Sequence, residues 1–121
     1  MTTYQLSVEL SEGMTNVYAL YGNADTPLSA PPAYQSSDPA EVNVGGVSPA
    51  LFSSFPDAQY DSWLTIGATD GSATDALRTV GIPFDTWTAS TALTTSDGLI
   101  FVTPDTAPGG TVVVGQMTVS S

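Results

Sequence analysis

The chain has 121 residues, twelve carboxylates and one cation, Arg78, which gives a formal net charge of −11. Phosphate binding requires Lys and Arg side chains that displace counterions, so this balance argues against a nucleic-acid partner and, equally, against an anionic membrane surface. The length predicts a single domain over residues 1–121, large enough to bury about two thirds of its unfolded surface.

Several residue types that carry chemistry are missing. The chain has no cysteine and no histidine, which excludes disulfides, zinc-thiolate sites, thiol nucleophiles and the commonest general base. Serine-hydrolase chemistry lacks both the histidine and the lysine that activate a serine. The first residues lack the basic start and apolar run of a signal peptide, and no apolar run is long enough to span a membrane. We therefore expect a soluble product that is not exported by the Sec route.

The N-terminal part predicts a β-hairpin. Residues 4–10 alternate apolar and polar side chains, which is typical of a half-buried strand. Glu12 and Gly13 favour a turn, and residues 16–21 predict a second strand rich in Val and Tyr.

Residues 25–56 contain six prolines, so neither a long helix nor a central strand is expected there. One short strand is predicted over residues 41–44. The segment also carries apolar side chains, which predict an ordered wrap over the core rather than a disordered linker. These anchors are Tyr34, Leu51, Phe52 and Phe55.

Residues 59–71 predict the strand around which the core is built. Leu64 and Ile66 fall on one face and Trp63 on the other, so this strand is expected to be covered on both sides. Asp70-Gly71 is a turn signal that ends it.

The remaining chain predicts one short helix, over residues 72–80, and then strands at residues 84–88, 93–97, 99–103 and 111–119. No internal repeat or domain boundary is visible. The fold class predicted is all-β, a single-domain β-sandwich or jelly-roll-like structure with at most one short helix and a proline-rich wrapping segment at about 25–56.

Asp70-Gly-Ser-Ala-Thr-Asp75 is a candidate calcium loop, because calcium accepts carboxylate, hydroxyl and carbonyl oxygens in flexible geometry. The stretch does not match the EF-hand pattern, since no Glu follows at the required place. The alternative interpretation is a turn followed by a helix cap, which uses the same residues. No metal or cofactor is therefore assigned.

A second candidate is a pair of carboxylates for glycoside hydrolysis, flanked by aromatic side chains that stack on sugar rings. The carboxylates are Asp57, Asp61 and Asp85, and the aromatic residues are Tyr60, Trp63 and Trp87. The alternative interpretation places the aspartates in turns and the tryptophans in the core, and no catalytic residue is assigned.

Two further features have simple interpretations. The glycine pairs Gly45-Gly46 and Gly109-Gly110 lack the lysine of a phosphate loop and therefore predict turns. Arg78 is expected either in a bidentate pair with an aspartate at an interface or in a surface salt bridge of little consequence.

Several stretches resemble a poorly characterised β-rich module of marine bacterial, phage and microalgal proteins. They are Val17-Tyr-Ala-Leu-Tyr-Gly22, Pro31-Pro-Ala-Tyr-Gln35, Val44-Gly-Gly-Val-Ser-Pro-Ala-Leu-Phe52, Tyr60-Asp-Ser-Trp-Leu-Thr-Ile-Gly67 and Gly81-Ile-Pro-Phe-Asp-Thr-Trp87. The resemblance extends to proteins that assemble into shells, including those around microalgal pyrenoids. It implies a scaffold and carries no catalytic residues.

Together these features predict a non-enzymatic structural protein of a larger assembly, most concretely a phage or virus capsid decoration or appendage protein at the virion surface. The expected partners are copies of itself, in a homo-oligomer, or a capsid or shell protein, with no cofactor. The alternative is a cell-surface module that binds carbohydrate or calcium.

Overall fold

The computed structural model describes residues 1–36, 42–72, 76–103 and 107–120. Within these ranges the chain forms strands and short 3-10 turns and no α-helix, which confirms the all-β class. The 3-10 turns are η1 (Pro49–Leu51), η2 (Pro56–Tyr60) and η3 (Phe84–Thr86). The strands are β1 (Thr2–Glu9), β2 (Ala19–Tyr21), β3 (Leu28–Ala30), β4 (Trp63–Leu64), β5 (Leu77–Val80), β6 (Leu93–Thr95), β7 (Leu99–Val102) and β8 (Thr111–Val119).

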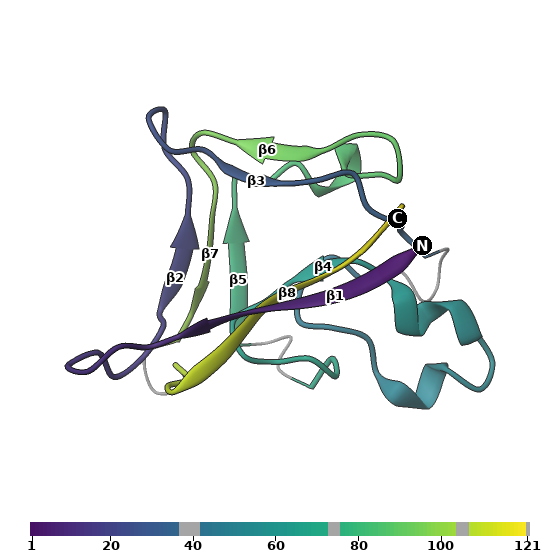
Figure 1. Ribbon diagram of the computed structural model, residues 1–121, viewed down its shortest axis with the longest axis horizontal. Coiled ribbons are helices and arrows are strands. Elements are labelled where there is room, and N and C mark those ends of the chain that lie inside the picture. Colours follow the sequence, from purple (N-terminus) through teal and green to yellow (C-terminus); the bar gives the residue numbers. More distant parts are fainter. Residues whose placement is uncertain (37–41, 73–75, 104–106, 121) are drawn as a thin grey trace.

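The strands pair antiparallel in three small sheets, with the orders β1-β8-β4, β2-β7-β5 and β3-β6. In Figure 1 the sheet β2-β7-β5 stands upright, the pair β3-β6 crosses above it, and the long β1-β8 ribbon crosses below. The three sheets share one main core, because each contributes to the same cluster of buried side chains. Its members include Ala30, Leu64, Leu77, Leu93, Ile100, Val102, Val112 and Met117, with Trp87 and Ile66 from the connections.

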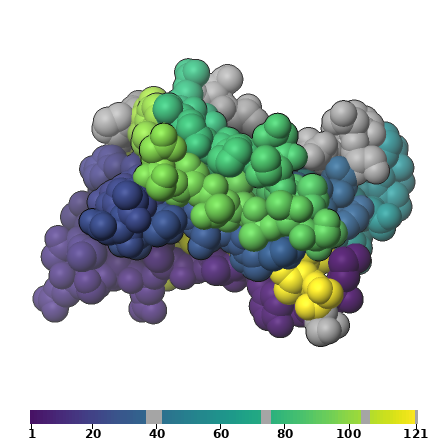
Figure 2. All heavy atoms as spheres, turned by 90° about the horizontal axis from the view of Figure 1, so that it is seen from above, coloured from purple at the N-terminus to yellow at the C-terminus, as the bar shows by residue number. Residues whose placement is uncertain are grey.

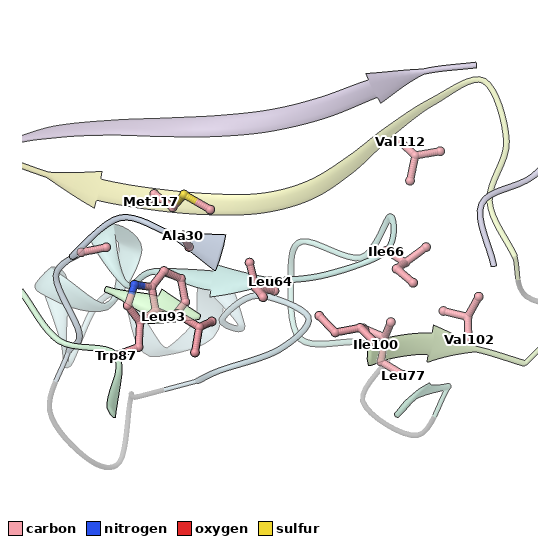
Figure 3. Packing of buried hydrophobic residues seen from close by; sticks show 11 residues of the cluster. Ala30, Leu64, Ile66, Leu77, Trp87, Leu93, Ile100, Val102, Val112 and Met117 are labelled. Atoms are coloured by element: carbon pink, nitrogen blue, oxygen red, sulfur yellow. The ribbon is translucent and has the colours of Figure 1, made fainter. Parts of the chain in front are cut away.

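Strand β8 is the centre of its sheet and was predicted at the same residues, 111–119. Its Val-rich sequence suits a pleated, buried surface. Val112 and Met117 point from β8 into the main core, as Figure 3 shows, while Val113 packs against a second, smaller cluster on the other face. The two clusters explain why a strand with apolar residues on both faces lies in the middle of this sheet.

The predicted core strand over residues 59–71 is only partly correct. Residues 61–66 are all buried, and the two faces divide as expected, with Leu64 and Ile66 in the main cluster and Trp63 in the second. The regular strand, however, is only Trp63–Leu64, and it lies at the edge of the ladder formed with β8. Beside it, Val44 makes an isolated parallel bridge to Leu64.

Asp61 is the polar centre of this buried stretch. Its side chain is fully buried; Oδ1 accepts the N–H of Ser36 at 2.9 Å and Oδ2 accepts that of Val42 at 2.8 Å. The Asp61 carbonyl accepts Nε2 of Gln116 at 2.8 Å. Hydrogen bonds to the charged form compensate the desolvation of a buried carboxylate. Asp61 therefore fastens the proline-rich segment to the stretch that leads into β4 and, through Gln116, to β8.

Residues 33 and 34 of the proline-rich segment bond to distant parts of the chain, whereas the predicted anchor Phe55 is exposed, so the wrap over residues 25–56 stays a prediction. Ala33 is buried and donates its N–H to the Thr88 carbonyl, and the N–H of Tyr34 bonds to the Thr118 carbonyl at 2.8 Å. Residues 37–41 lie outside the described residues, so the strand predicted at 41–44 is represented only by the Val44 bridge.

The predicted hairpin is wrong, although the turn at Gly13 is present with φ 92°. Strand β1 pairs with β8, and β2 pairs with β7, where Leu20 lies opposite the fully buried Ile100. The long β1 finds a partner of matching length only at the other end of the chain. A pairing between the chain ends leaves no signal in the local pattern.

Two further predictions of secondary structure fail, the helix at residues 72–80 and the strand at residues 84–88. The helix predicted at 72–80 is wrong, because Leu77–Val80 form β5 on the edge of β7, where tertiary pairing overrides weak helix propensity. Residues 73–75 lie outside the described part. The strand predicted at 84–88 is also wrong: η3 follows Pro83 and turns Trp87 inward, so that its indole N–H bonds to the Pro31 carbonyl at 2.8 Å.

Replacing Asp61 by Ala removes the acceptor of two backbone N–H groups in the interior. We expect Asp61→Ala to lower the free energy of unfolding by about 2–4 kcal/mol, because leaving each such group unsatisfied costs about 1–3 kcal/mol. Urea denaturation measures the change. The matched control is Asp85→Ala, an exposed carboxylate whose removal is expected to change stability by less than about 0.5 kcal/mol. Equal effects of the two substitutions would contradict this role of Asp61.

Candidate functional site

Strand β1 is the most exposed regular element of the described chain. Every residue from Thr3 to Glu9 is exposed, including Tyr4 at 56%, Leu6 at 43% and Val8 at 39%. The expectation of a half-buried strand is therefore wrong in burial, although the strand itself is confirmed. Contiguous exposed apolar side chains mark a contact surface, and in the isolated chain these three are covered only in part.

The register explains why the core fails to cover β1. Tyr4 lies opposite Met117, Leu6 opposite Gly115 and Val8 opposite Val112, so the apolar side chains of β1 are on the core face of the sheet. Figure 3 shows the core cluster beneath β8, with β1 beyond it. The main core cluster includes side chains of β8 but none of β1.

The edge of β1 that faces away from β8 is also open. Strand order places β1 at the end of its sheet, and no described strand pairs with that edge. In the view of Figure 2 the dark purple N-terminal atoms lie beside the yellow C-terminal ones at the rim of the molecule. Such an edge presents a row of backbone N–H and C=O groups that accept another strand.

Strand β1 lacks the features that usually protect an edge. It contains no proline, no glycine and no lysine, and its only charged side chain, Glu9, is its last residue. The register shifts between Leu6 and Ser7, where Val114 of β8 has no partner residue in β1. The β-bulge therefore lies in β8, and β1 itself has no bulge that would protect its edge. We define β1, its apolar face and its open edge as the β1 surface.

The candidate calcium loop is described only at its beginning. Asp70 Oδ1 accepts the Ser72 N–H at 3.1 Å and the Ser72 hydroxyl at 2.5 Å, which is the turn of the alternative interpretation. Asp75 lies outside the described residues. Among the residues that are described, no three metal-binding side chains group together.

The proposed carbohydrate-hydrolysing group is not assembled. Trp63 and Trp87 are each only 2% exposed and belong to the two core clusters, so neither is open to stack on a sugar. Asp61 serves as the buried acceptor described above, and Asp85 lies exposed in η3. The expectation that the tryptophans flank a catalytic pair is therefore wrong, and the interpretation of core tryptophans is correct.

Asp57 and Tyr60, by contrast, border a hollow of about 410 Å³ that sequence analysis did not identify. The hollow is lined by Met1, Thr3, Tyr34, Asp57, Tyr60 and Thr118. Burial raises the pKa of the Tyr34 phenol above its usual value, and the nearby negative charges of Asp57 and Asp61 raise it further. The only sequence signal was an aromatic residue close to an aspartate in 56–60, which is too common a pattern to mark a site.

The remaining candidates occupy ordinary positions. Gly45, Gly46 and Gly110 have positive φ angles, as expected in turns, and Gly46 packs directly against the Thr69 backbone. Arg78 lies exposed on β5, and its pairing with an aspartate stays a prediction.

Neither a protein-family profile nor a curated protein nor a solved structure matches this chain. The resemblance to a β-rich module of marine bacterial, phage and microalgal proteins therefore stays a prediction carried by the quoted residues. Among the helical segments of the described ranges, none is long and apolar enough to cross a membrane.

The Asp70 turn predicts an acid-dependent contribution to stability. Hydrogen bonds from the side chain and backbone of Ser72 lower the pKa of Asp70. A lowered folded-state pKa stabilises the fold at pH values above the unfolded-state pKa, and this contribution is lost as the pH falls through the folded-state pKa. In a carboxyl-detected NMR titration we expect Ser72→Ala to raise the Asp70 midpoint towards its ordinary value. An unchanged midpoint would contradict the assignment.

Proposed function

We propose that this chain is a non-enzymatic structural protein of a larger assembly and that it docks through the β1 surface. Its partners are copies of itself or a capsid or shell protein that offers a strand. One observation carries the proposal: a long strand with an apolar face and a single charge, at its last residue, stays exposed at an open sheet edge. The sequence adds that the commonest general base and every thiol are missing.

The β1 surface suits strand addition. In this mode, main-chain hydrogen bonds along an open edge give affinity, and alternate side chains give specificity. A partner strand on β1 extends the sheet and brings its own apolar side chains over Tyr4, Leu6 and Val8. The side chains of the partner strand thus cover the apolar side chains of β1 that the core leaves exposed.

A second copy of the chain is itself a suitable partner. In an antiparallel pair related by a two-fold axis at Leu6, Tyr4 of each copy lies opposite Val8 of the other, and the two apolar faces stay on one side of the sheet. Pairs of aromatic and β-branched residues stabilise such ladders. Glu9 lies opposite Thr3 in this register, so the pair brings no like charges directly together.

The charge distribution fits the same role. The net charge of −11 makes separate copies repel one another at long range, whereas Thr2–Val8 carry no charge at the contact itself. An acidic surface around the uncharged residues Thr2–Val8 keeps the particle soluble while it allows one specific contact. A small acidic β-domain with these properties is most concretely a phage or virus capsid decoration or appendage protein at the virion surface.

The proposal predicts that Leu6→Lys reduces self-association. Fully burying a leucine side chain contributes about 1.5–3 kcal/mol, so loss of this burial weakens the association about tenfold or more. Sedimentation equilibrium of the purified protein measures the association constant. The control is Val80→Lys, which adds the same charge at an apolar residue that is 54% exposed on β5, and it is expected to change the constant little.

Salt provides a second arm of this experiment. Self-association of chains of equal sign strengthens as salt screens their repulsion, since the Debye length falls from about 30 Å at 0.01 M to about 8 Å at 0.15 M. A wild-type chain that stays monomeric at high protein and salt concentration would exclude copies of itself as partner. Association that Leu6→Lys leaves unchanged would exclude the β1 surface.

A further inference from the structure

The hollow beside the start of β1 has walls from three separate parts of the chain. Asp57 and Tyr60 come from η2, Tyr34 comes from the proline-rich segment, and Thr3 and Thr118 come from the β1-β8 ladder. Met1, which precedes β1, completes the lining, so the surface combines two phenol rings, one carboxylate, two hydroxyl groups and the N-terminal residue. Asp57 is exposed, and Tyr60 is 44% exposed.

Each wall is held in place by hydrogen bonds. The Tyr34 N–H donates to the Thr118 carbonyl at 2.8 Å, and its own carbonyl accepts the Ser62 N–H at 3.1 Å. The hydroxyl groups of Thr3 and Thr118 lie 2.6 Å apart and bond to each other.

The wall formed by η2 is tied to the core as well. Nε2 of Gln116 donates to the carbonyls of Gln59 and Asp61, at 3.1 and 2.8 Å. The end of η2 is thereby fixed to β8. A hollow with walls fixed in advance loses little conformational entropy when a ligand enters.

The charge of the hollow decides which ligand class it takes. Asp57 is a carboxylate at its border; the pKa of Tyr34 is raised mainly by burial and further by the negative charges of Asp57 and of the buried Asp61. The one cationic side chain, Arg78, lies on β5 in another sheet, so the amino terminus of Met1 is the positive group at the border of the hollow, within a chain of net charge −11. Anions are therefore repelled and cations attracted.

We propose that the hollow bounded by Tyr34, Asp57 and Tyr60 binds an organic cation, a guanidinium or ammonium group. The carboxylate of Asp57 supplies the opposite charge, and the electron-rich faces of tyrosine rings attract cations. This site is independent of the proposed function, since it needs neither self-association nor the open edge of β1.

Two other ligand classes fit less well. A bare divalent metal ion requires several oxygen ligands, and the described residues contain no group of three metal-binding side chains. A neutral sugar also stacks on aromatic rings, but it leaves the Asp57 charge unmatched. The size of the hollow accommodates the planar end of an arginine side chain together with its methylene groups.

Saturation-transfer NMR on the ligand tests the proposal, because it works whether or not the protein assembles. The probe is N-acetyl-arginine amide, compared with its neutral isostere N-acetyl-citrulline amide at low salt. We expect saturation of the arginine probe at millimolar concentration and at least about tenfold weaker binding of the citrulline probe. Methylguanidinium and a short arginine-containing peptide then separate a free small cation from a side chain of a partner protein.

Variants locate the site. Asp57→Asn is expected to weaken binding of the arginine probe about tenfold, whereas Asp85→Asn, which changes the net charge equally, leaves it within about twofold. Tyr60→Phe keeps the aromatic face and is expected to keep binding, while Tyr60→Leu is expected to lose it. Equal binding of the two probes, equal effects of the two aspartate variants, or a preference for a methyl glycoside would overturn the proposal.

Discussion

The antiparallel ladder between β1 and β8 is the interaction on which the structure and its proposed role depend. It joins the two ends of the described chain, and it places β8 between β1 and β4. Because β8 already fills both of its faces with the two core clusters, β1 is left beyond the core. The same ladder that completes the sheet therefore leaves an exposed strand at its edge whose only charge is at its last residue.

The hydrogen bonds of Asp61 connect the proline-rich segment, the stretch that leads into β4, and β8. Burying a carboxylate is costly, and the N–H groups of Ser36 and Val42 in the proline-rich segment compensate that cost for Asp61. Gln116 extends the network to β8. Gln116 also donates to the Gln59 carbonyl and so holds the end of η2, which borders the proposed cation site.

Much of the fold was predictable from the sequence, because strong periodicity and turn residues mark it locally. Strands β1, β7 and β8, the all-β class and the division of Leu64 and Trp63 between two faces were all predicted. Strand partners were not, since β1 and β8 are separated by most of the chain and several partners fit an alternating pattern. The strand at Leu77–Val80 was missed because only its pairing with β7 makes it extended.

In the candidate site, too, local features were predictable from the sequence and contacts between distant segments were not. Asp57, Asp61 and Tyr60 were candidates from the sequence, but for a hydrolytic group to which no catalytic role was assigned and whose flanking tryptophans are buried. The contributions of Tyr34 and Thr118 to the hollow depend on contacts between distant segments. The exposure of β1 was equally hidden, because an alternating strand has the same sequence whether or not the core reaches it.

Hydrogen exchange of residues 2–9 tests the central claim, that the open edge of β1 is a docking edge, most directly. The account predicts that the β1 amides pointing away from β8 exchange rapidly in dilute protein and slowly in the assembled state, while amides within the β1-β8 ladder are protected in both. Rapid exchange of the outward amides in the assembled state would contradict it.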